Sequence, residues 1–395
     1  MENGNEIVVY STTWCPDCKR AKRFFGEQRI PYVNVDIDQD AEAMERVREL
    51  NDGKRIIPTI VFPDGSVLVE PSNAELAEKL GLQTEAAQNY YDVIVVGAGP
   101  AGLTAALYLA REGVETLVIE KGALGGQTAI TNILENYPGF DEGISGSEFA
   151  ARLGRQARRF DAEILQAQEV AEIRQLGPYF CVTTTAGQEY DAKAVLLASG
   201  ARYRRLNVPG EAALLGLNIH FCATCDGAFY KGKKVLVVGG GNSGFEEGIF
   251  LTRFADQVDI VEFQPEVKAS HFLQEQVEHR AEISVITNHA VQAFKGQHAL
   301  EGIVVEDRAT GETKEWDHDG VFVFIGLSPN NALVAEMAEL DDDGFVVTDQ
   351  ALMTAVPGLF AAGDVRAGAT KQAAAAAGEG ATAALMIREY LQRVG

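Results

Sequence analysis

Short apolar and amphipathic segments alternate over the first part of the chain. Ala21, Phe24 and Phe25 have the spacing of one helix face, and Asp64-Gly65 has the composition of a hairpin turn. The expected strands cover residues 7–10, 32–35, 59–62 and 67–69, and the expected helices cover 19–28, 41–50 and 74–80. We therefore expect a small α/β domain over residues 1–82, followed by a polar linker over 83–90.

From Tyr91 onward, a different and longer pattern of strands and helices begins. An apolar strand leads into a glycine turn, a helix and a second strand, first over residues 92–120 and again over 234–262. The two turns are Gly97-x-Gly99-x-x-Gly102 and Gly239-x-Gly241-x-x-Gly244. In both copies an acidic residue, Glu120 or Glu262, lies 23 residues past the first glycine. The repeat predicts two doubly wound dinucleotide-binding units.

Each part of these units has a physical role in binding a dinucleotide. The first glycine permits a tight turn, the second lets the backbone approach a pyrophosphate, and the third lets the helix pack on the sheet. The helix N-terminus supplies N–H groups and a positive dipole end for phosphates. Glu120 or Glu262 can accept a hydrogen bond from a ribose hydroxyl. Two such sites in one chain predict hydride transfer between a nicotinamide and a flavin.

The C-terminal region favours the first unit as the flavin site. Residues 359–364 form a strand that ends in Gly363-Asp364, whose carboxylate can reach a flavin ribityl hydroxyl or phosphate. The Ala-rich segment after Gln372 suits a helix packed on a cofactor, although an ordinary packed helix explains it equally well. A flavin domain that needs both flanks has the nicotinamide domain inserted within it. The expected domains are an FAD-binding one over 91–205 and 328–395 and an NAD(H)-binding one over 206–327.

The end of the second unit bears on the choice of nicotinamide. NADP sites place Arg or Lys there to bind the 2′-phosphate. This chain places Glu262 there, and its carboxylate would repel a phosphate and accept a hydrogen bond from a hydroxyl. We therefore expect NADH rather than NADPH, with Lys268 and Arg253 as the only nearby cations that could support NADPH.

Four of the five cysteines form two Cys-x-x-Cys pairs. Cys15 and Cys18 open a predicted helix, where the dipole favours a thiolate at Cys15 and Cys18 can resolve a mixed disulfide. Cys222 and Cys225 lie about a dozen residues before the second unit. Because a neighbouring carboxylate raises the pKa of a thiol, Asp226 is better suited to exchange protons with a leaving thiolate.

Structural interpretations compete with these chemical ones. Two Cys-x-x-Cys pairs can form a zinc site, but here they lie in different domains, so we expect no metal. Cys181 lies in a strand-like segment and is expected to be a small buried residue. The six histidines have no ligand spacing, which favours surface or core roles. Pro58 precedes a strand at the place where redoxin folds hold a cis proline beside the cysteines.

Composition narrows the class of protein further. A chain of 395 residues suits two or three domains, and its 46% hydrophobic and 23% charged residues are ordinary for a globular protein. A net charge of −23 argues against nucleic acid and anionic membranes as partners. The chain contains no long apolar stretch and starts without the features of a signal peptide, so we expect a cytoplasmic protein.

These motifs together resemble a known family. Residues 91–395 are similar to the low-molecular-weight thioredoxin reductases, through Gly97-Ala-Gly-Pro-Ala-Gly102, Gly125-Gly126-Gln127, Glu135-Asn136-Tyr-Pro-Gly139, Cys222-Ala-Thr-Cys225-Asp226 and Gly363-Asp364. The stretch from Gly239 through Asn242 to Glu262 looks closer to the NADH-using flavoprotein subunit of alkyl hydroperoxide reductase. The His-Arg-Arg motif of the NADPH enzymes is missing. Residues 6–82 resemble a glutaredoxin, nearer to mycoredoxins, through Trp14-Cys15-Pro-Asp-Cys18, Ile57-Pro58-Thr59 and Asp64-Gly65-Ser66.

The resemblance implies a thioredoxin fold for residues 1–82 and a role for each matching residue. Cys225 would face the flavin, Cys222 would attack the next disulfide, Asp226 would act as acid and base, and Pro58 would line the redoxin groove. The implied FAD-binding residues are Gly97, Gly99, Gly102, Glu120, Gly126, Gln127, Asn136, Gly363, Asp364 and Gln372, and the implied NADH-binding residues are Gly239, Gly241, Asn242, Gly244 and Glu262. Such enzymes are homodimers whose nicotinamide domain rotates to present NADH and the cysteine pair to the flavin in turn.

A relay follows as a hypothesis: NADH reduces FAD to FADH⁻, FADH⁻ reduces the Cys222–Cys225 disulfide, and the resulting dithiol reduces Cys15–Cys18. The acceptor beyond Cys15 would be a peroxiredoxin, a thioredoxin or another protein disulfide, or a low-molecular-weight thiol disulfide. The peroxide-reductase flavoprotein carries a double-thioredoxin N-terminal domain, whereas this chain has one redoxin module, so the acceptor stays open. The alternatives are a conventional thioredoxin reductase acting on a separate thioredoxin, and a redoxin module acting as a redox sensor or binding an iron–sulfur cluster.

Overall fold

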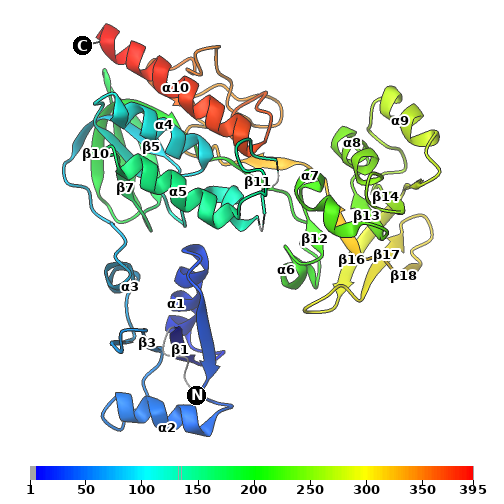
Figure 1. Ribbon diagram of the computed structural model, residues 1–395, viewed down its shortest axis with the longest axis horizontal. Coiled ribbons are helices and arrows are strands. Elements are labelled where there is room, and N and C mark those ends of the chain that lie inside the picture. The colour runs from blue at the N-terminus through cyan, green and yellow to red at the C-terminus, as the bar shows by residue number, and fades with distance from the viewer. Residues whose placement is uncertain (1–5, 132, 135, 395) are drawn as a thin grey trace.

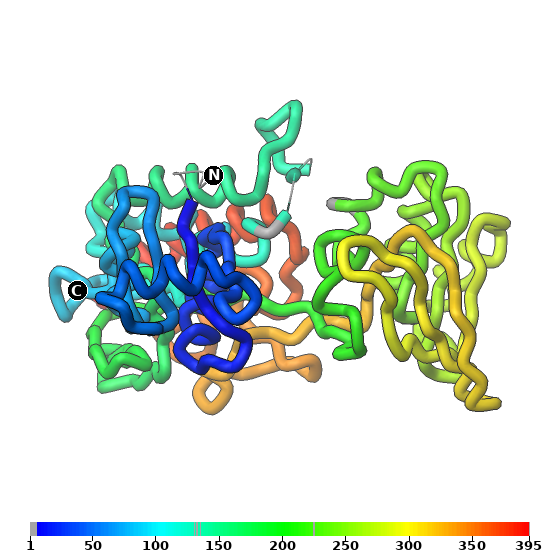
Figure 2. Tube along the Cα trace, turned by 90° about the horizontal axis from the view of Figure 1, so that it is seen from below, coloured from blue at the N-terminus to red at the C-terminus, as the bar shows by residue number. Residues whose placement is uncertain are grey.

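The chain forms three domains, with the redoxin domain and the nicotinamide domain on either side of a central flavin-type domain (Figure 1). The computed structural model describes residues 6–131, 133–134 and 136–394, and the side chains of Ile130, Thr224 and Cys225 lie outside this description. The N-terminal redoxin domain contacts the central domain, and the nicotinamide domain stands apart from the redoxin domain in both views (Figures 1 and 2). Within the described residues, no helix combines the length and apolar character needed to cross a membrane.

The redoxin domain has a four-stranded sheet in the order β2-β1-β3-β4. β1 pairs with β2 in parallel and with β3 antiparallel, and β3 pairs antiparallel with β4, which confirms the thioredoxin-type fold. The elements are β1 Ile7–Ser11, α1 Pro16–Glu27, β2 Tyr32–Asp36, α2 Ala41–Leu50, β3 Thr59–Val61, β4 Val67–Val69 and α3 Asn73–Lys79. α1 begins earlier than the predicted residue 19, because Pro16 is tolerated in a first turn and the Cys15 sulfur caps it. Phe24, Phe25 and Ile60 lie in the hydrophobic core of the redoxin domain.

The polar segment over residues 83–89 contains no helix or strand and is anchored, and β5 already begins at Tyr90, within the expected linker. The Glu163 carboxylate accepts hydrogen bonds from Ala87 N at 2.8 Å, from Gln83 Nε2 and from the Tyr91 hydroxyl. Gln83 O accepts a further bond from Gln166 N. The connection therefore runs along the central domain instead of forming a free tether.

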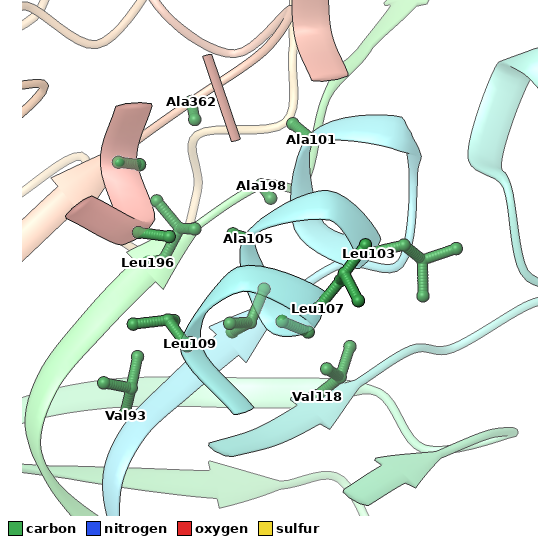
Figure 3. Packing of buried hydrophobic residues seen from close by; sticks show 14 of the residues in the cluster. Val93, Ala101, Leu103, Ala105, Leu107, Leu109, Val118, Leu196, Ala198 and Ala362 are labelled. Atoms are coloured by element: carbon green, nitrogen blue, oxygen red, sulfur yellow. The ribbon is translucent and has the colours of Figure 1, made fainter. Parts of the chain in front are cut away.

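The central domain is built on a seven-stranded sheet in the order β7-β6-β5-β10-β9-β8, with β21 paired to β10. Its elements are β5 Tyr90–Val96, α4 Pro100–Arg111, β6 Thr116–Ile119, the 3-10 turn η1 Gly126–Ile130, α5 Gly146–Arg158, β7 Glu163–Leu165, β8 Val170–Leu176, β9 Tyr179–Thr184, β10 Glu189–Leu197, β21 Leu359–Ala361 and α10 Ala373–Val394. Leu103 and Leu109 of α4 lie in one buried hydrophobic cluster with residues of the sheet and of α10 (Figure 3). The C-terminal segment therefore completes a sheet that starts some 270 residues earlier.

The nicotinamide domain is inserted in the central one, as the predicted fold class requires. A parallel sheet in the order β12-β19-β13-β14-β15 carries a three-stranded antiparallel sheet beside it. Its elements are α6 Glu211–Leu214, β12 Ile219–His220, α7 Ala223–Asp226, the 3-10 turn η2 Gly227–Tyr230, β13 Lys234–Val238, α8 Asn242–Leu251, β14 Gln257–Val261, α9 His271–Glu278, β15 Ile283–Ile286, β16 His289–Lys295, β17 Gly302–Asp307, β18 Thr313–Trp316 and β19 Gly320–Val323. A two-stranded ribbon of β11 Ala201–Tyr203 and β20 Leu327–Pro329 joins the two domains. α8 ends at Leu251, and just past it the Thr252 hydroxyl Oγ1 donates a hydrogen bond back to Ile249 O.

Candidate active site

The first glycine turn follows β5 and leads into α4. Gly97 has φ +104°, which favours glycine, and its N–H donates to Ile119 O at 2.9 Å. A Cβ built on Gly102 would overlap the carbonyl oxygen of Gly97, so the helix packs against the turn with no space for a side chain. Gly99 caps α4 and has nothing within 4 Å of where its Cβ would stand. The open backbone at a helix N-terminus fits the pyrophosphate of FAD.

The acid at the end of β6 lies against the same turn. Glu120 accepts hydrogen bonds from Ala98 N and Gly122 N, each at 2.7 Å. Its carboxylate is thereby fixed beside the first two residues of the turn, where an adenosine ribose of FAD would fit.

The predicted residues of the C-terminal region meet this turn from the other side. Gly363 N donates to Glu379 Oε2 at 2.7 Å, and Arg366 pairs with the same carboxylate at 2.6 Å. Burial raises the pKa of Asp364, an effect that the nearby Lys371 opposes. The backbone at Gly363-Asp364 is therefore held by Glu379, a residue that the sequence analysis missed.

Two predicted flavin neighbours that lie far apart in the sequence contact each other. Asn136 Nδ2 donates to Gln372 Oε1 at 3.1 Å across 236 residues. Gln127 is exposed in η1, beside Gly126. A Cβ on Gly126 would lie 3.5 Å from Gly99 Cα. The structure thus brings the Gly126, Asn136 and Gln372 segments to the same end of the central domain as the first glycine turn.

The second glycine turn repeats the geometry of the first. Gly239 has φ +123° and donates to Val261 O at 2.9 Å, and a Cβ on Gly244 would overlap the Gly239 carbonyl oxygen. Gly241 caps α8 and has open space at its Cβ position. Glu262 accepts from Gly240 N at 2.6 Å and from Gln264 N at 2.8 Å. The repeat read from the sequence therefore extends to the bonding of each acid.

Asn242 begins α8 and fixes the segment opposite. Its Oδ1 accepts a hydrogen bond from Ser270 N at 2.7 Å, and Gly240 O accepts bonds from Lys268 N and Ala269 N. Lys268 therefore follows the turn closely, with its side chain exposed.

The set of cations near Glu262 differs from the sequence expectation. Arg253 lies past the C-terminal end of α8, with its guanidinium 5.1 Å from the Phe250 ring centre, so it is a helix length away from the glycine turn. Arg308 was missed, because it follows β17 and lies 45 residues from Phe263 in the sequence. Its guanidinium lies 3.6 Å from the Phe263 ring centre and donates to Phe263 O at 2.6 Å. The expectation that Lys268 and Arg253 were the only nearby cations was therefore wrong.

The N-terminal cysteine pair stands at the start of α1. Cys15 and Cys18 form a disulfide with a Cα–Cα distance of 5.3 Å, and Cys18 N–H donates to Cys15 Sγ at 3.0 Å. The Ile57–Pro58 peptide is cis, and Cys15 Sγ lies 3.8 Å from Ile57 O. A sulfur that receives a backbone N–H at a helix start is in the environment that stabilises a thiolate after reduction.

The second cysteine motif lies on α7, which in the chain lies between the β11 strand of the interdomain ribbon and α8. Cys222 is half-buried just before the helix. The expectation that Cys225 faces the flavin concerns a side chain that lies outside the described part of the chain. The Ala223 backbone donates to Glu247 of α8, whose pKa is raised by burial and by the charge of Glu246. A carboxylate therefore caps the cysteine helix, an arrangement that the sequence analysis missed.

Asp226 is joined to two buried side chains. Its Oδ2 lies 3.2 Å from Nδ1 of His220, and Nε2 of His220 lies 2.7 Å from the Tyr230 hydroxyl. Burial raises the pKa of Tyr230, and the charge of Asp226 raises it further. His220 is buried and both of its ring nitrogens have a partner, in line with the expected core role of the histidines. One of these partners is Asp226, the predicted acid–base residue. The chain Asp226–His220–Tyr230 can hold or move a proton at the end of α7.

Tyr203, in strand β11 of the ribbon that joins the two domains, lies near both halves of the site. Its ring stacks on Phe221, next to Cys222, with centres 4.9 Å apart. Burial raises the pKa of Tyr203 to about 12, and the charges of Asp364, Glu247 and Asp226 contribute to the shift. The cysteine helix and the Asp364 loop are therefore both close to this tyrosine.

The remaining cysteine is structural. Cys181 lies in β9, is 4% exposed, and has a pKa raised chiefly by burial. Of the residues that the structure describes, no three or more His, Cys, Asp or Glu side chains are placed to hold a metal ion.

Comparisons with known proteins agree with this geometry. Residues 91–380 match the family model described as pyridine nucleotide-disulphide oxidoreductase, and residues 7–67 match the glutaredoxin model. A thioredoxin reductase of Bacillus subtilis is 39% identical over 308 residues, which are 78% of this chain and 96% of that protein. A bifunctional thioredoxin reductase/thioredoxin of Mycobacterium leprae is 42% identical over 77% of this chain and 66% of its own length. The crystal structure of a thioredoxin reductase from Streptococcus pyogenes has a TM-score of 0.72 at 37% identity, covering 78% of this chain and all of that one.

Two nucleotide-binding units joined by a two-stranded ribbon, together with a Cys-x-x-Cys helix, define a disulfide reductase with two dinucleotide sites. The chain belongs to the pyridine nucleotide-disulphide oxidoreductase family, where its relatives are thioredoxin reductases, and it carries an N-terminal glutaredoxin domain. This family implies FAD and a pyridine nucleotide as cofactors.

Proposed function

We propose that the chain is an NADH-dependent disulfide reductase that passes electrons from Cys222–Cys225 to its own Cys15–Cys18 pair, and from there to an external disulfide. One observation carries the proposal: a redoxin domain with a disulfide at a helix N-terminus is attached by a short anchored linker to a reductase. Attachment raises the effective concentration of the redoxin over that of a separate protein.

Bound FAD would take two electrons from a nicotinamide and supply them to a disulfide. In this chain, Gly97, Gly99, Gly102 and Glu120 would hold it on one side and the Gly363-Asp364 loop on the other. Asp226, backed by His220 and Tyr230, supplies the proton for a thiolate that leaves when Cys222–Cys225 opens, and takes one up when it closes. Cys15 then acts as nucleophile toward the acceptor, and Cys18 resolves the mixed disulfide.

The docked redoxin domain turns its cysteines outward. Gln28 and Arg29, just past the end of α1, contact the central domain, whereas Cys15 caps the opposite end. A helix of 12 residues spans about 18 Å. We therefore infer that the docked position offers Cys15 to an external acceptor, and that its reduction takes place after undocking or from a second copy of the chain.

Replacing Cys15 tests the relay. Cys15→Ser should keep NADH-dependent reduction of a dye such as ferricyanide, since the dye takes electrons before the redoxin, but should reduce turnover of a disulfide substrate by about 100-fold or more. Cys181→Ala is a matched control, because Cys181 is buried away from both pairs, and it should leave both activities unchanged. Unchanged disulfide turnover in Cys15→Ser would refute the relay.

A conventional thioredoxin reductase acting on a separate thioredoxin is the second candidate, because the docked redoxin faces outward. It predicts fast turnover of added thioredoxin by Cys15→Ser. A redox sensor predicts negligible disulfide turnover and, if a cluster is bound, iron–sulfur absorbance. Steady-state assays with added thioredoxin, a peroxiredoxin and a low-molecular-weight disulfide separate these functions.

Three finer assignments remain part of the proposal. NADH rather than NADPH is supported by the position of Glu262 beside the second turn. The homodimer is supported by resemblance to the thioredoxin reductases, and sedimentation of the holoenzyme tests it. A reducing compartment such as the cytoplasm suits two pairs that cycle between thiol and disulfide.

A further inference from the structure

The redoxin domain docks on a specific loop of the central domain. Ala123 N donates to Glu27 O at 3.1 Å, and Gln28 Nε2 donates to Lys121 O at 3.0 Å. A Cβ on Gly122 would lie 3.2 Å from Glu27 O, so the two backbones approach closely at this glycine. Gln28 is 7% exposed, which places its side chain inside the contact.

This loop connects two parts of the flavin site. It starts after Glu120, the acid held by Ala98 N, and ends at Gly126, whose Cβ position lies 3.5 Å from Gly99 Cα. Gly122 N itself donates to Glu120 at 2.7 Å. The docking loop therefore borders the glycine turn at the pyrophosphate end of the site.

Arg29 brings a positive charge to this place from the redoxin domain. Its Nη2 donates to Gly126 O at 2.7 Å. The surrounding protein lowers the pKa of the guanidinium by desolvating it, and the charge of Glu120 raises it. Within the described residues Arg29 forms no ion pair, whereas Lys121 pairs with Glu169 and Arg366 with Glu379.

We propose that Arg29 of the redoxin domain is an FAD-binding residue, and that its guanidinium binds the pyrophosphate from the side opposite α4. A guanidinium has five N–H donors, of which the Gly126 bond uses one, and its fork matches phosphate oxygens. In a chain with net charge −23, a cation at this position offsets a general repulsion of the cofactor phosphates. Redoxin docking and flavin binding are then thermodynamically linked, so each stabilises the other.

Titration of the full-length apoprotein with FAD, followed by flavin fluorescence, tests the proposal. Arg29→Ala should raise the Kd for FAD about tenfold, and Arg29→Lys, which keeps the charge, should restore part of the affinity. ADP carries the pyrophosphate without the flavin, and its inhibition constant as a competitor of FAD binding should rise by the same factor. Alanine leaves the backbone strain at φ +53° unchanged, so the side chain alone is altered.

Two controls separate a direct contact from a general effect. Arg23→Ala removes an exposed arginine of α1 that pairs with Glu27 and should leave the Kd for FAD unchanged. Gln28→Ala weakens docking while keeping the cation, and should change the Kd less than threefold. The proposal is overturned if Arg29→Ala binds FAD as tightly as Arg23→Ala. Thermal unfolding of each apoprotein verifies that the variants are folded.

Discussion

The two dinucleotide units have the same local structure but different surroundings. Both have a first glycine with positive φ and an acid that accepts a hydrogen bond from the turn. In both, the third glycine has no room for a Cβ, because the carbonyl oxygen of the first glycine lies there. Around the first unit, α10 packs so closely on α4 that a Cβ on Gly380 would overlap Ala101 O. The docking loop and the Gly363 segment also border it. Around the second unit, Asn242 and Glu246 at the start of α8 are exposed.

This difference explains how one motif can serve two kinds of ligand. A site bordered by α10, the Gly363 segment and the docking loop can hold its ligand through many contacts, which suits a cofactor retained between turnovers. A site with an exposed helix start can exchange its ligand, which suits a nicotinamide that enters and leaves. On the proposed assignment, the surroundings and not the glycine motif distinguish the site of the resident cofactor from the site of the nicotinamide.

The strongest test compares the third glycines. Gly102→Ala and Gly244→Ala each force α4 or α8 away from its turn, because the new methyl would overlap a backbone carbonyl. We expect Gly102→Ala to lose bound flavin and with it all activity. We expect Gly244→Ala to keep a full complement of flavin but to be reduced by NADH at least about 100-fold more slowly. Flavin absorbance per protein and stopped-flow reduction by NADH measure both effects.

Gly26→Ala is the control for this comparison, since Gly26 lies in α1 with nothing within 4 Å of its Cβ position. Retained flavin in Gly102→Ala, or lost flavin in Gly244→Ala, would show that the two sites are not divided as proposed.

A smaller effect is expected from the residues at the end of β14. Glu262→Gln should lower kcat/KM for NADH about tenfold, because a neutral amide accepts a weaker hydrogen bond from the ribose hydroxyl. Arg308→Ala should change kcat/KM for NADH less than about threefold, as this side chain lies on Phe263 and not on Glu262. Steady-state kinetics with both nicotinamides measure these ratios. A native preference for NADPH that Arg308→Ala abolishes would show that Arg308 binds the 2′-phosphate, against the NADH assignment.

Local patterns predicted most of the fold and the two glycine turns. The turns were predictable because their glycines and acids act within about 25 residues of sequence, through backbone geometry. Contacts between distant segments were not. Arg308 meets Phe263 across 45 residues, and Arg29 meets Gly126 across 97, with no local signal for either.

Sequence signals did exist for part of what was missed. His220 lies two residues before Cys222, so a histidine beside a redox motif could have been weighed as a partner of Asp226. The bond that joins them depends on α7 turning back toward β12, which periodicity does not predict. Glu379 had no such signal, because it looks like any polar position on a helix until β21 brings Gly363 to it.

The smallest effect concerns one residue that differs between the units. Three residues before each acid, the first unit has the buried Leu117 and the second has Asp259, which is 4% exposed. Asp259 accepts hydrogen bonds from Gln257 and His318, each at 2.9 Å, and pairs with Lys234 at 3.0 Å. Burial raises the pKa of Asp259, but His318, Lys234 and Gln257 outweigh burial and bring it to about 2.

A pKa lowered in the folded state gives stability that is present above the unfolded value near 4 and is lost as the pH falls toward 2. Asp259→Asn should therefore reduce the free energy of unfolding at pH 7 by about 1.5 kcal/mol, and the difference from the native chain should shrink between pH 4 and 2. Thermal unfolding at several pH values measures this difference. Asp92→Asn is a control, since Asp92 pairs with Lys193 at the start of the first unit at 3.5 Å and should change stability less. If the free energy of unfolding of Asp259→Asn stayed below that of the native chain by a constant amount down to pH 2, the charge of Asp259 would add nothing to stability. Only the shape of the side chain would then matter to the second unit.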